Sequence, residues 1–362
     1  MIASSTRSNL QNLVVKMTSH LLILNYCMDE DDPVFSQQTQ VVSKLLEHYS
    51  KITVITGRVG IYQKQVNLKV INTNWRAGKS FSNAVKFLIR ALPVIIVKRP
   101  SAIFSHMTEV QSFLLSLFSK ILRIRHYLWY AHASKSFYLI WNHVFLTGIV
   151  TSTFGSCPIS GPKVKTIGQA VDDKLFDFKQ IDLSNLKKLI HVGRFDKSKN
   201  VELIIKEVQV LRNEFSNLTL TLVGSPSNAN EYEYSNNVLN KYKYLVHEDW
   251  LTFRSSIPRR DIPELFSNFD IFVHSYQGSL DKTLIEATLS GLPVITLNFE
   301  YIKDFGSWCK QEQSAASHKQ QIECLFEMEQ YQVENELKRR REIAIKKHSL
   351  DNWILQLLRI IE

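Results

Sequence analysis

The sequence contains few cysteines, and those it has are far apart. Cys27, Cys157, Cys309 and Cys324 form no CxxC pair. Zinc sites and disulfide frameworks are usually built from closely spaced cysteines, so this spacing argues against both. It favours reduced thiols, as in a cytoplasmic protein.

Long apolar runs are also missing. A membrane-spanning helix needs roughly 18 apolar residues in succession, whereas the run Ala91–Val97 is short, contains Pro93 and is flanked by charge. The first sixteen residues are polar and lack the apolar core of a signal peptide, so we treat 1–16 as an extension and Met17 as a candidate natural start. We therefore expect a soluble protein or one that lies on a membrane surface.

Acidic residues are scarce in the first half. Residues 1–170 contain 19 Lys and Arg but 6 Asp and Glu, and no acidic residue lies between Lys51 and Arg99. Such a surface should attract an anionic partner, for example phospholipid headgroups, a pyrophosphate-bearing molecule or an acidic polysaccharide. The alternative is that the lysines only confer solubility. We expect no nucleic-acid partner, because the sequence has neither a recognition-helix motif nor an aromatic RNP-type strand.

Strand-like and helix-like segments alternate in two halves. A chain of 362 residues is expected to form two domains of about 150 to 200 residues. The pattern predicts an α/β fold of two Rossmann-like, doubly wound domains at 17–170 and 171–345, and a last helix at 346–362 with one apolar face for docking on the first domain. The apolar runs that predict strands are Leu21–Asn25, Lys51–Thr56, Leu68–Ile71, Ile95–Val97, Ala102–Ser105, His126–Ala131, Leu189–Val192, Leu218–Val223, Ile271–His274 and Pro293–Leu297.

Two segments contain the candidate site. His191–Asn200 (HVGRFDKSKN) and Gly278–Ile295 (GSLDKTLIEATLSGLPVI) are both predicted strand-to-helix turns. Together they supply backbone N–H groups, Arg194, Lys199 and Glu286. The helix start and the cations can take phosphates, and the carboxylate can accept hydrogen bonds from ribose hydroxyls. This combination suits a nucleoside diphosphate.

The same segments resemble the retaining glycosyltransferases of the GT-B fold, family 4 (glycosyl transferases group 1). HVGRFDKSKNVELIIKEV is similar to the donor-site turn of that family, and SYQGSLDKTLIEATLSGLPVI to its second hallmark. IPRRDIPELFSNFDIFVHS matches the connector between them, and KVKTIGQAVDDKLF resembles the interdomain crossing. The resemblance is strong in 165–300, moderate in 20–170 and faint beyond 300, and it implies a GT-B fold.

The resemblance also implies roles for single residues. Arg194 and Lys199 would bind the donor diphosphate, Glu286 the ribose hydroxyls, and the start of the following helix the β-phosphate. No metal or other cofactor is expected, because cations and helix dipoles would replace it. The catalytic residues implied are His132, Arg194, Lys199 and Glu286; the donor-binding residues are Gly193, Arg194, Lys199, Asp281, Lys282, Thr283, Leu284 and Glu286; the acceptor-side candidates are His106 and His132.

Several assignments have a structural alternative. Arg194 could pair with Asp196 on the surface, Glu286 could begin a solvated helix face, and His132 could be a core histidine. The acidic loop at Asp29, Asp31 and Asp32 could hold an acceptor base, although a solvated loop is favoured. The run Lys338–Arg341 is expected to be a solvated helix face.

The sequence departs from the family pattern at two places. Gly278 stands where the family usually has a second Glu, and Ser279, Leu280 and Asp281 replace its Gly-Phe-Gly. Asp281 and Lys282 could take over contacts to the donor sugar. The loop after the first strand, DDPVFSQQ at 31–38, has no glycine that would let a phosphate approach the backbone closely.

These observations predict a glycosyltransferase that uses a nucleotide-sugar donor. The acceptor would be a glycan or a lipid-linked molecule, the product would retain the anomeric configuration, and the pathway would be surface polysaccharide biosynthesis. The expected location is the cytoplasm, with the basic first domain on the cytoplasmic face of an anionic membrane. The alternative is a catalytically silent GT-B subunit that acts as a partner or scaffold.

Overall fold

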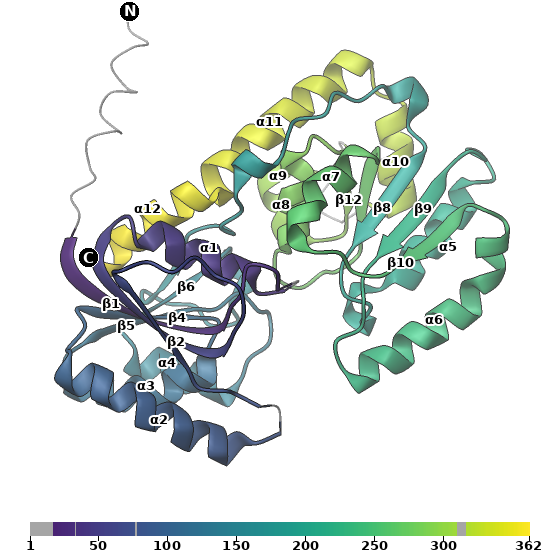
Figure 1. Cartoon of the computed structure of the whole chain (residues 1–362). Helices are drawn as coiled ribbons and strands as arrows, with labels where there is room; N and C mark the ends of the chain where they lie inside the picture. The colour runs from purple at the N-terminus through teal and green to yellow at the C-terminus, as the bar shows by residue number, and fades with distance from the viewer. Residues whose placement is uncertain (1–16, 33, 77, 310–315) are drawn as a thin grey trace, which may run out of the picture.

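The chain folds around two parallel sheets, each covered by helices (Figure 1). The computed structural model describes residues 17–32, 34–76, 78–309 and 316–362. The first sheet has seven strands in the order β3-β2-β1-β4-β5-β6-β7, and the second has five in the order β10-β9-β8-β11-β12. The prediction of two doubly wound α/β halves is confirmed.

The first half contains the seven-stranded sheet and four helices. Helices α2, α3 and α4 cover one face of this sheet, and α1 covers the other (Figure 1). The elements are β1 (Met17–Met28), α1 (Ser36–Leu45), β2 (Tyr49–Val59), β3 (Leu68–Asn72), α2 (Ser80–Val97), β4 (Ala102–His106), α3 (Glu109–Ile121), β5 (Arg125–Trp129), α4 (Phe137–Phe145), β6 (Gly148–Thr151) and β7 (Val164–Thr166).

The second half contains the five-stranded sheet and helices α5 to α11. Its elements are β8 (Lys188–Val192), α5 (Val201–Leu211), β9 (Thr219–Val223), α6 (Ala229–His247), β10 (Leu251–Arg254), α7 (Ile262–Ser267), β11 (Ile271–His274), α8 (Lys282–Leu289), β12 (Val294–Thr296), α9 (Phe299–Phe305), α10 (His318–Phe326) and α11 (Gln330–His348). The last helix of the chain is α12 (Leu350–Ile361).

Each sheet reverses its winding direction beside its first strand. In the first sheet the reversal lies between β1 and β4, and in the second between β8 and β11. The loops that leave the carboxyl ends of two such strands turn to opposite faces of the sheet and leave a crevice between them. The two crevices therefore predict where a ligand binds.

The last helix returns to the first half and packs against its sheet. Trp353 and Leu357 of α12 are fully buried in the same cluster as Leu21 and Val41. The ring of Trp353 contacts Trp129 with 5.2 Å between ring centroids. In Figure 1 α12 lies beside α1, on the face of the sheet opposite to α2. The chain thus crosses between the two halves twice.

The strand expected at Ile95–Val97 is wrong, because α2 continues to Val97. Phe87, Ala91 and Val94 are buried at helical spacing, and Pro93 lies within the helix on its exposed side. With 18 residues, α2 is long and apolar enough to cross a membrane by length and composition. The expectation that no segment reaches this length is therefore also wrong.

Two expectations about single residues are corrected. The cysteine spacing argued against a disulfide, but Cys309 and Cys324 form one. The fold brings these two residues together although they are 15 positions apart in the sequence. Cys27 and Cys157 are free and buried. Within the run expected to be a solvated face, Arg340 is buried over the ring of Trp308, 4.2 Å from its centroid.

Candidate active site

A cavity of about 480 Å³ lies between the two halves. It is bounded by the loops that follow β1, β4 and β5 on one side and β8, β9, β10 and β11 on the other. It is therefore at the crevice that the sheet topology predicts. Of the candidate catalytic, donor-binding and acceptor-side residues, those that line it are His106, His132, Gly193, Arg194, Lys199, Asp281, Lys282 and Thr283.

The turn after β8 brings a cation to the cavity. Gly193 follows the last residue of β8, and its N–H donates to the Val223 carbonyl at 3.0 Å. A Cβ at Gly224 would overlap the Gly193 carbonyl oxygen, so the two turns fit together only with glycine there. Lys199 then ends a short 3₁₀ turn and is 7% exposed. A lysine this deeply buried needs anionic partners.

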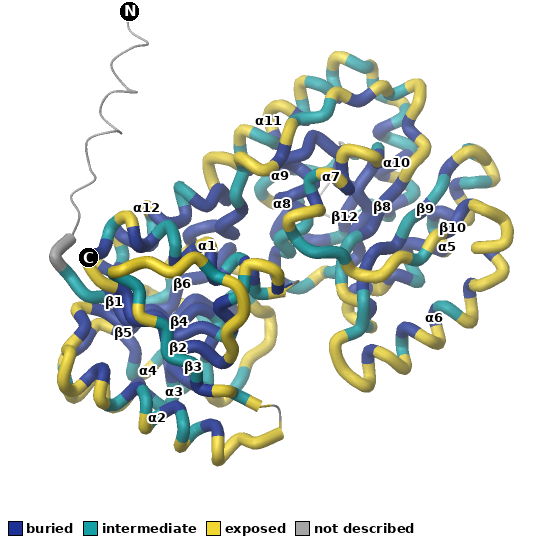
Figure 2. Tube along the Cα trace, in the orientation of Figure 1, coloured by how far each residue is buried: buried dark blue, intermediate teal, exposed yellow. Residues whose placement is uncertain are grey.

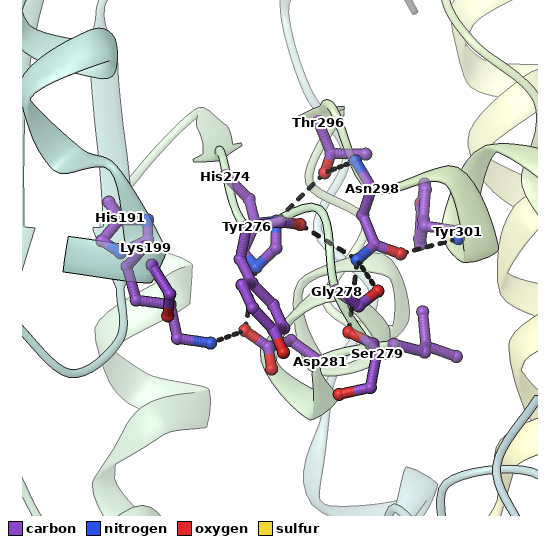
Figure 3. A network of polar contacts seen from close by, with 12 residues as sticks. His191, Lys199, His274, Tyr276, Gly278, Ser279, Asp281, Thr296, Asn298 and Tyr301 are labelled. Carbon is purple, nitrogen blue, oxygen red and sulfur yellow. Dashed lines mark hydrogen bonds and ion pairs between the residues drawn. The ribbon is translucent and has the colours of Figure 1, made fainter. Parts of the chain in front are cut away.

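Lys199 has its partners in the loop after β11 (Figure 3). Its ammonium group pairs with the Asp281 carboxylate and lies 3.9 Å from the centroid of the Tyr276 ring. His274 Nε2 lies 3.0 Å from the same carboxylate. Burial opposes ionisation of Asp281, but Lys199 and His274 outweigh it and hold the pKa of the carboxyl group well below its usual range. The carboxylate is therefore ionised at neutral pH.

The first turn of α8 begins at the cavity and has no side-chain cap. Asp281 occupies the N-cap position but makes no capping hydrogen bond, because its carboxylate is turned towards Lys199 and His274. Lys282 and Thr283 line the cavity, whereas the Leu284 side chain is buried in the core. An uncapped helix start next to two lysines is a favourable place for an anion.

Asn298 holds the loop that carries Asp281. Its side-chain amide donates to the carbonyls of Tyr276, Gly278 and Ser279 at 3.0, 3.2 and 3.2 Å, and its carbonyl oxygen accepts from the Tyr301 N–H at 3.0 Å. These contacts are drawn in Figure 3. Asn298 is fully buried, so it fixes the loop from inside the domain.

Tyr276 accounts for the missing acidic side chain at position 278. A Cβ at Gly278 would overlap the Tyr276 hydroxyl group, so no larger residue fits while this ring keeps its place. The same ring lies against the Lys199 ammonium group. The carboxylate beside Lys199 is instead supplied by Asp281.

Glu286 is set back from the cavity by one turn of α8. Glu286 does not line the cavity itself. Its Oε1 pairs with Arg259, and Arg259 does line the cavity. Its other carboxylate oxygen, Oε2, is buried and has no hydrogen-bond partner among the residues that the structure describes. One acceptor is therefore available to a ligand hydroxyl group that reaches this depth.

Arg194 faces the cavity but is paired with two carboxylates. Nη1 lies 3.3 Å from Glu231 Oε1, and Nη2 lies 3.8 Å from Asp196 Oδ2. Its side chain is 53% exposed. The pairing of Arg194 with Asp196 that was considered as an alternative is thus present, and Glu231 on α6 adds a second carboxylate. An anion in the cavity must share Arg194 with Glu231 or draw it away.

The two histidines on the acceptor side have different surroundings. His132 lies at the cavity, three residues beyond β5; burial first and Arg194 second lower its pKa. His106 is the last residue of β4, stacked on Trp353 at 6.0 Å between ring centroids. Burial lowers the pKa of His106 to about 3. Both rings are therefore neutral at physiological pH.

The acidic loop after β1 has structural partners. Asp32 Oδ1 accepts from the N–H groups of Val34 and Phe35 at 2.9 and 2.7 Å, and its other oxygen pairs with Arg58. Asp31 pairs with Arg260 of the second half. These aspartates do not line the cavity. The loop therefore orders the start of α1 and contacts the opposite half.

Three cavity residues that shape the site were given no role from the sequence. Arg259 was quoted as part of a connector, and Tyr276 and Gly224 were not assigned a role. Each follows a strand of the second sheet within a few residues: β10, β11 and β9 respectively. Their position after a strand end was the available signal, because such positions meet at one edge of a parallel sheet.

The second half matches a known family. Residues 173–347 match the family described as Glycosyl transferases group 1. Spore coat protein SA of Bacillus subtilis (strain 168) is 27% identical over 171 residues, which cover 41% of this chain and 43% of that protein. The match therefore spans less than half the length of this relative.

Solved structures match over nearly the whole chain. HepE from Anabaena, in complex with UDP and glucose, has a TM-score of 0.71 at 15% identity and covers 94% of this chain and 98% of its own. A glycosyltransferase from Rickettsia africae ESF-5 has a TM-score of 0.71 at 12% identity, with 95% and 98% covered. Identities this low carry the fold alone. The resemblance seen in the sequence is thus confirmed: residues 173–347 match the glycosyl transferases group 1 family, within a chain that has the GT-B fold.

Proposed function

We propose that this protein is a glycosyltransferase that moves a sugar from a nucleotide-sugar donor to a glycan or a lipid-linked acceptor. The observation that carries the proposal is the convergence of Arg194, Lys199, Lys282 and the uncapped start of α8 on one cavity. Three cations and a helix start in one cavity suit a diphosphate better than any neutral ligand. HepE, similar in fold, binds UDP and glucose, which agrees with this choice.

In the proposed complex the diphosphate lies between the turn after β8 and the start of α8. Arg194 and Lys199 stabilise the negative charge that grows on the leaving phosphate as the sugar departs. Glu286 accepts hydrogen bonds from the ribose hydroxyls through its unpartnered oxygen. His132, from the opposite wall, faces the donor sugar near the acceptor. The two halves exclude water and so protect the donor from hydrolysis.

Two further features belong to this proposal. The anomeric configuration is retained by a same-face route assisted by the leaving phosphate, and no metal ion is needed because the cations and α8 carry the charge. Proton NMR of the product, with and without a chelator, tests both. An inverted product would contradict the first feature, and loss of transfer on chelation would contradict the second.

The basic first half supports a location for this reaction. We propose that the protein works at the cytoplasmic face of an anionic membrane, on a precursor of a surface polysaccharide. The excess of 19 Lys and Arg over 6 Asp and Glu in residues 1–170 favours anionic headgroups. Binding to anionic vesicles at low salt tests the location.

A catalytically silent subunit is the second candidate, and one observation favours it. The cations of the cavity already have carboxylate partners: Lys199 pairs with Asp281, and Arg194 with Glu231 and Asp196. A donor must compete with these pairs. A protein that uses the cavity only as a rigid interface would keep them permanently.

A screen with nucleotides separates the two candidates. We expect one of UDP, GDP, ADP, CMP or dTDP to stabilise the purified protein against heat, by about 2.7 kcal/mol at one hundred times its dissociation constant. Arg194→Ala should abolish most of this stabilisation. If none of the five stabilises the wild-type protein, the silent subunit becomes the better account.

Nucleotide binding should weaken as the pH rises above about 7. Burial, and then Arg259, lower the pKa of Lys282 to about 7, so its ammonium group loses its proton in the free protein near neutral pH. A bound diphosphate favours the charged form, so binding above pH 7 takes up a proton. The dissociation constant should rise roughly tenfold for each pH unit above this pKa.

The control for this pH dependence is Lys282→Arg. Its guanidinium group stays charged over the whole range, so calorimetric titration should give an affinity that changes little between pH 7 and 9. An equally flat profile for the wild-type protein would show that Lys282 does not take part in binding.

A further inference from the structure

Helix α2 exposes apolar side chains along one entire side. Its exposed hydrophobic residues recur at helical spacing: Phe81, Val85, Ile89, Pro93, Ile96 and Val97. Phe81 is 84% exposed and Ile89 is 66% exposed. A surface helix of a soluble protein normally turns polar residues to this side. The outer side of α2 therefore needs a covering partner.

Helices α3 and α4 extend this surface. On α3 the polar residues Ser112, Ser116 and Ser119 are buried, whereas Leu117, Phe118 and Ile121 are exposed. Two of the buried serines have local partners: Ser116 Oγ accepts from Trp141 Nε1 at 2.9 Å, and Ser119 Oγ donates to the Ser116 carbonyl at 2.9 Å. Helix α3 thus buries several serines and exposes three large apolar side chains, whereas an ordinary surface helix does the opposite.

The three helices form one surface, which we call the outer apolar face. They lie side by side under the seven-stranded sheet, on the side away from α1 and α12 (Figure 1), and Figure 2 marks many exposed positions along them. The outer apolar face consists of Phe81, Val85, Ile89, Ile96, Val97, Leu117, Phe118, Ile121, Phe137, Ile140 and Val144.

The charges around this face are almost all positive. Residues 79–145, which contain the three helices, hold nine Lys and Arg and a single acidic residue, Glu109. Glu109 is engaged by the Ser136 hydroxyl group at 2.8 Å. An apolar surface framed by basic residues is complementary to an anionic bilayer, whose headgroups are negative and whose interior is apolar.

We propose that the outer apolar face inserts into the headgroup region of an anionic lipid bilayer, with α2, α3 and α4 lying along the membrane surface. This proposal rests on the anionic membrane partner proposed above. It adds which surface of the protein contacts the membrane and that the contact is by insertion. Helix α2 does not cross the bilayer, although its length and composition allow it. The strands on either side of it, β3 and β4, belong to one sheet, and Phe87, Ala91 and Ile95 are buried against that half.

Insertion at this face brings the cavity close to the membrane. His132 lines the cavity, and Phe137, five residues later and 65% exposed, begins the α4 part of the outer apolar face. A lipid-linked acceptor held in the bilayer would then reach the cavity without leaving the membrane surface.

Vesicle flotation of the full chain tests the proposal. The probes are phosphatidylcholine vesicles with and without phosphatidylglycerol, at low salt and at about 1 M salt, where screening leaves charge effects over only about 3 Å. We expect binding to the anionic vesicles that falls with salt but persists at 1 M. Ile89→Glu and Phe137→Glu should each lower the vesicle partition coefficient about tenfold or more.

Matched controls come from exposed apolar residues elsewhere. Leu355 lies on α12, on the opposite side of the sheet, and Val210 lies on α5 of the second half. Leu355→Glu and Val210→Glu should change partitioning less than about twofold. Unchanged thermal unfolding and nucleotide stabilisation would show that each variant is folded.

The other outcomes overturn the proposal in distinguishable ways. Wild-type binding that vanishes at 1 M salt and is unaffected by Ile89→Glu would leave the anionic membrane partner standing but remove insertion. Absence of binding to any vesicle would remove both, without bearing on the donor site. A soluble dimer that Ile89→Glu converts to a monomer would assign the outer apolar face to a second copy of the chain.

A label at the face gives a second measurement. Cys27 and Cys157 are buried and Cys309 and Cys324 are bonded to each other, so the thiol of Ile89→Cys can be labelled selectively. An environment-sensitive dye there should shift to the blue on anionic vesicles. A spectrum unchanged by bound vesicles would contradict insertion.

Discussion

Replacing Lys199 by alanine is expected to lower kcat/KM for the nucleotide sugar by about 10²- to 10³-fold. The ammonium group of Lys199 is buried at the cavity and held in place by Asp281 and Tyr276. A preorganised cation of this kind stabilises charge on the leaving phosphate without reorganisation during the reaction. Asp281 keeps His274 as a partner in the variant, so the fold should persist. Initial rates at several donor concentrations measure the effect.

The matched control is Lys197→Ala. Lys197 lies in the same 3₁₀ turn as Lys199, but it is exposed and does not line the cavity. Its removal should change kcat/KM less than about twofold, as is usual for an exposed charge. An equal loss of kcat/KM in both variants would mean that the net charge of the turn determines activity, and that the position of Lys199 in the cavity does not.

Glu286→Gln is expected to weaken donor binding about 100-fold. The carboxylate has one oxygen on Arg259 and one that is buried and unpartnered. Hydrogen bonds to a charged acceptor contribute roughly 1.5 to 3 kcal/mol each, and the amide also leaves the Arg259 guanidinium group without its counter-ion. The loss should appear mainly in KM, because the ribose contacts are the same in the ground state and the transition state.

Glu264→Gln serves as the control for this variant. Glu264 is on α7 and exposed, so the same chemical change there should leave KM unaltered. A normal KM for Glu286→Gln would remove the ribose role and leave Glu286 as a purely structural partner of Arg259.

The sequence was sufficient to predict two doubly wound sheets and the two turns that line the cavity, although it gave no sign of β6, β7 or β10. Buried parallel strands are continuous apolar runs, which is why Leu21–Asn25 and Ile271–His274 were found. The turn with Arg194 and Lys199 was found because two cations at a short spacing after a predicted strand are a local sequence pattern that suits phosphate binding. Both residues line the cavity.

The other features of the site could not be predicted, because they depend on contacts between segments that are distant in the sequence. Nothing near Asp281 in the sequence indicates that its carboxylate faces Lys199, or that Tyr276 fills the space above Gly278. The Arg194 pair with Glu231 joins residues 37 positions apart. Such pairs depend on how two strand-to-helix turns pack against each other. A local sequence pattern does not show this packing.

The outer side of α2 was misjudged for a different reason. The apolar run at Ile95–Val97 was expected to be a strand, and β-branched residues such as these do favour sheets. Its apolar residues instead divide between the two sides of one helix: Ile95 faces the sheet, and Ile96 and Val97 are exposed. Composition alone does not show which side of an apolar helix is covered.

The most direct test of the donor site is calorimetric titration of the stabilising nucleotide into the wild-type protein, Lys199→Ala and Lys197→Ala. The site described above predicts one nucleotide bound per chain, an affinity reduced about 100-fold or more in Lys199→Ala, and an unchanged affinity in Lys197→Ala. Equal binding by wild-type protein and Lys199→Ala would contradict the site, and absence of binding by the wild-type protein would contradict the proposed activity.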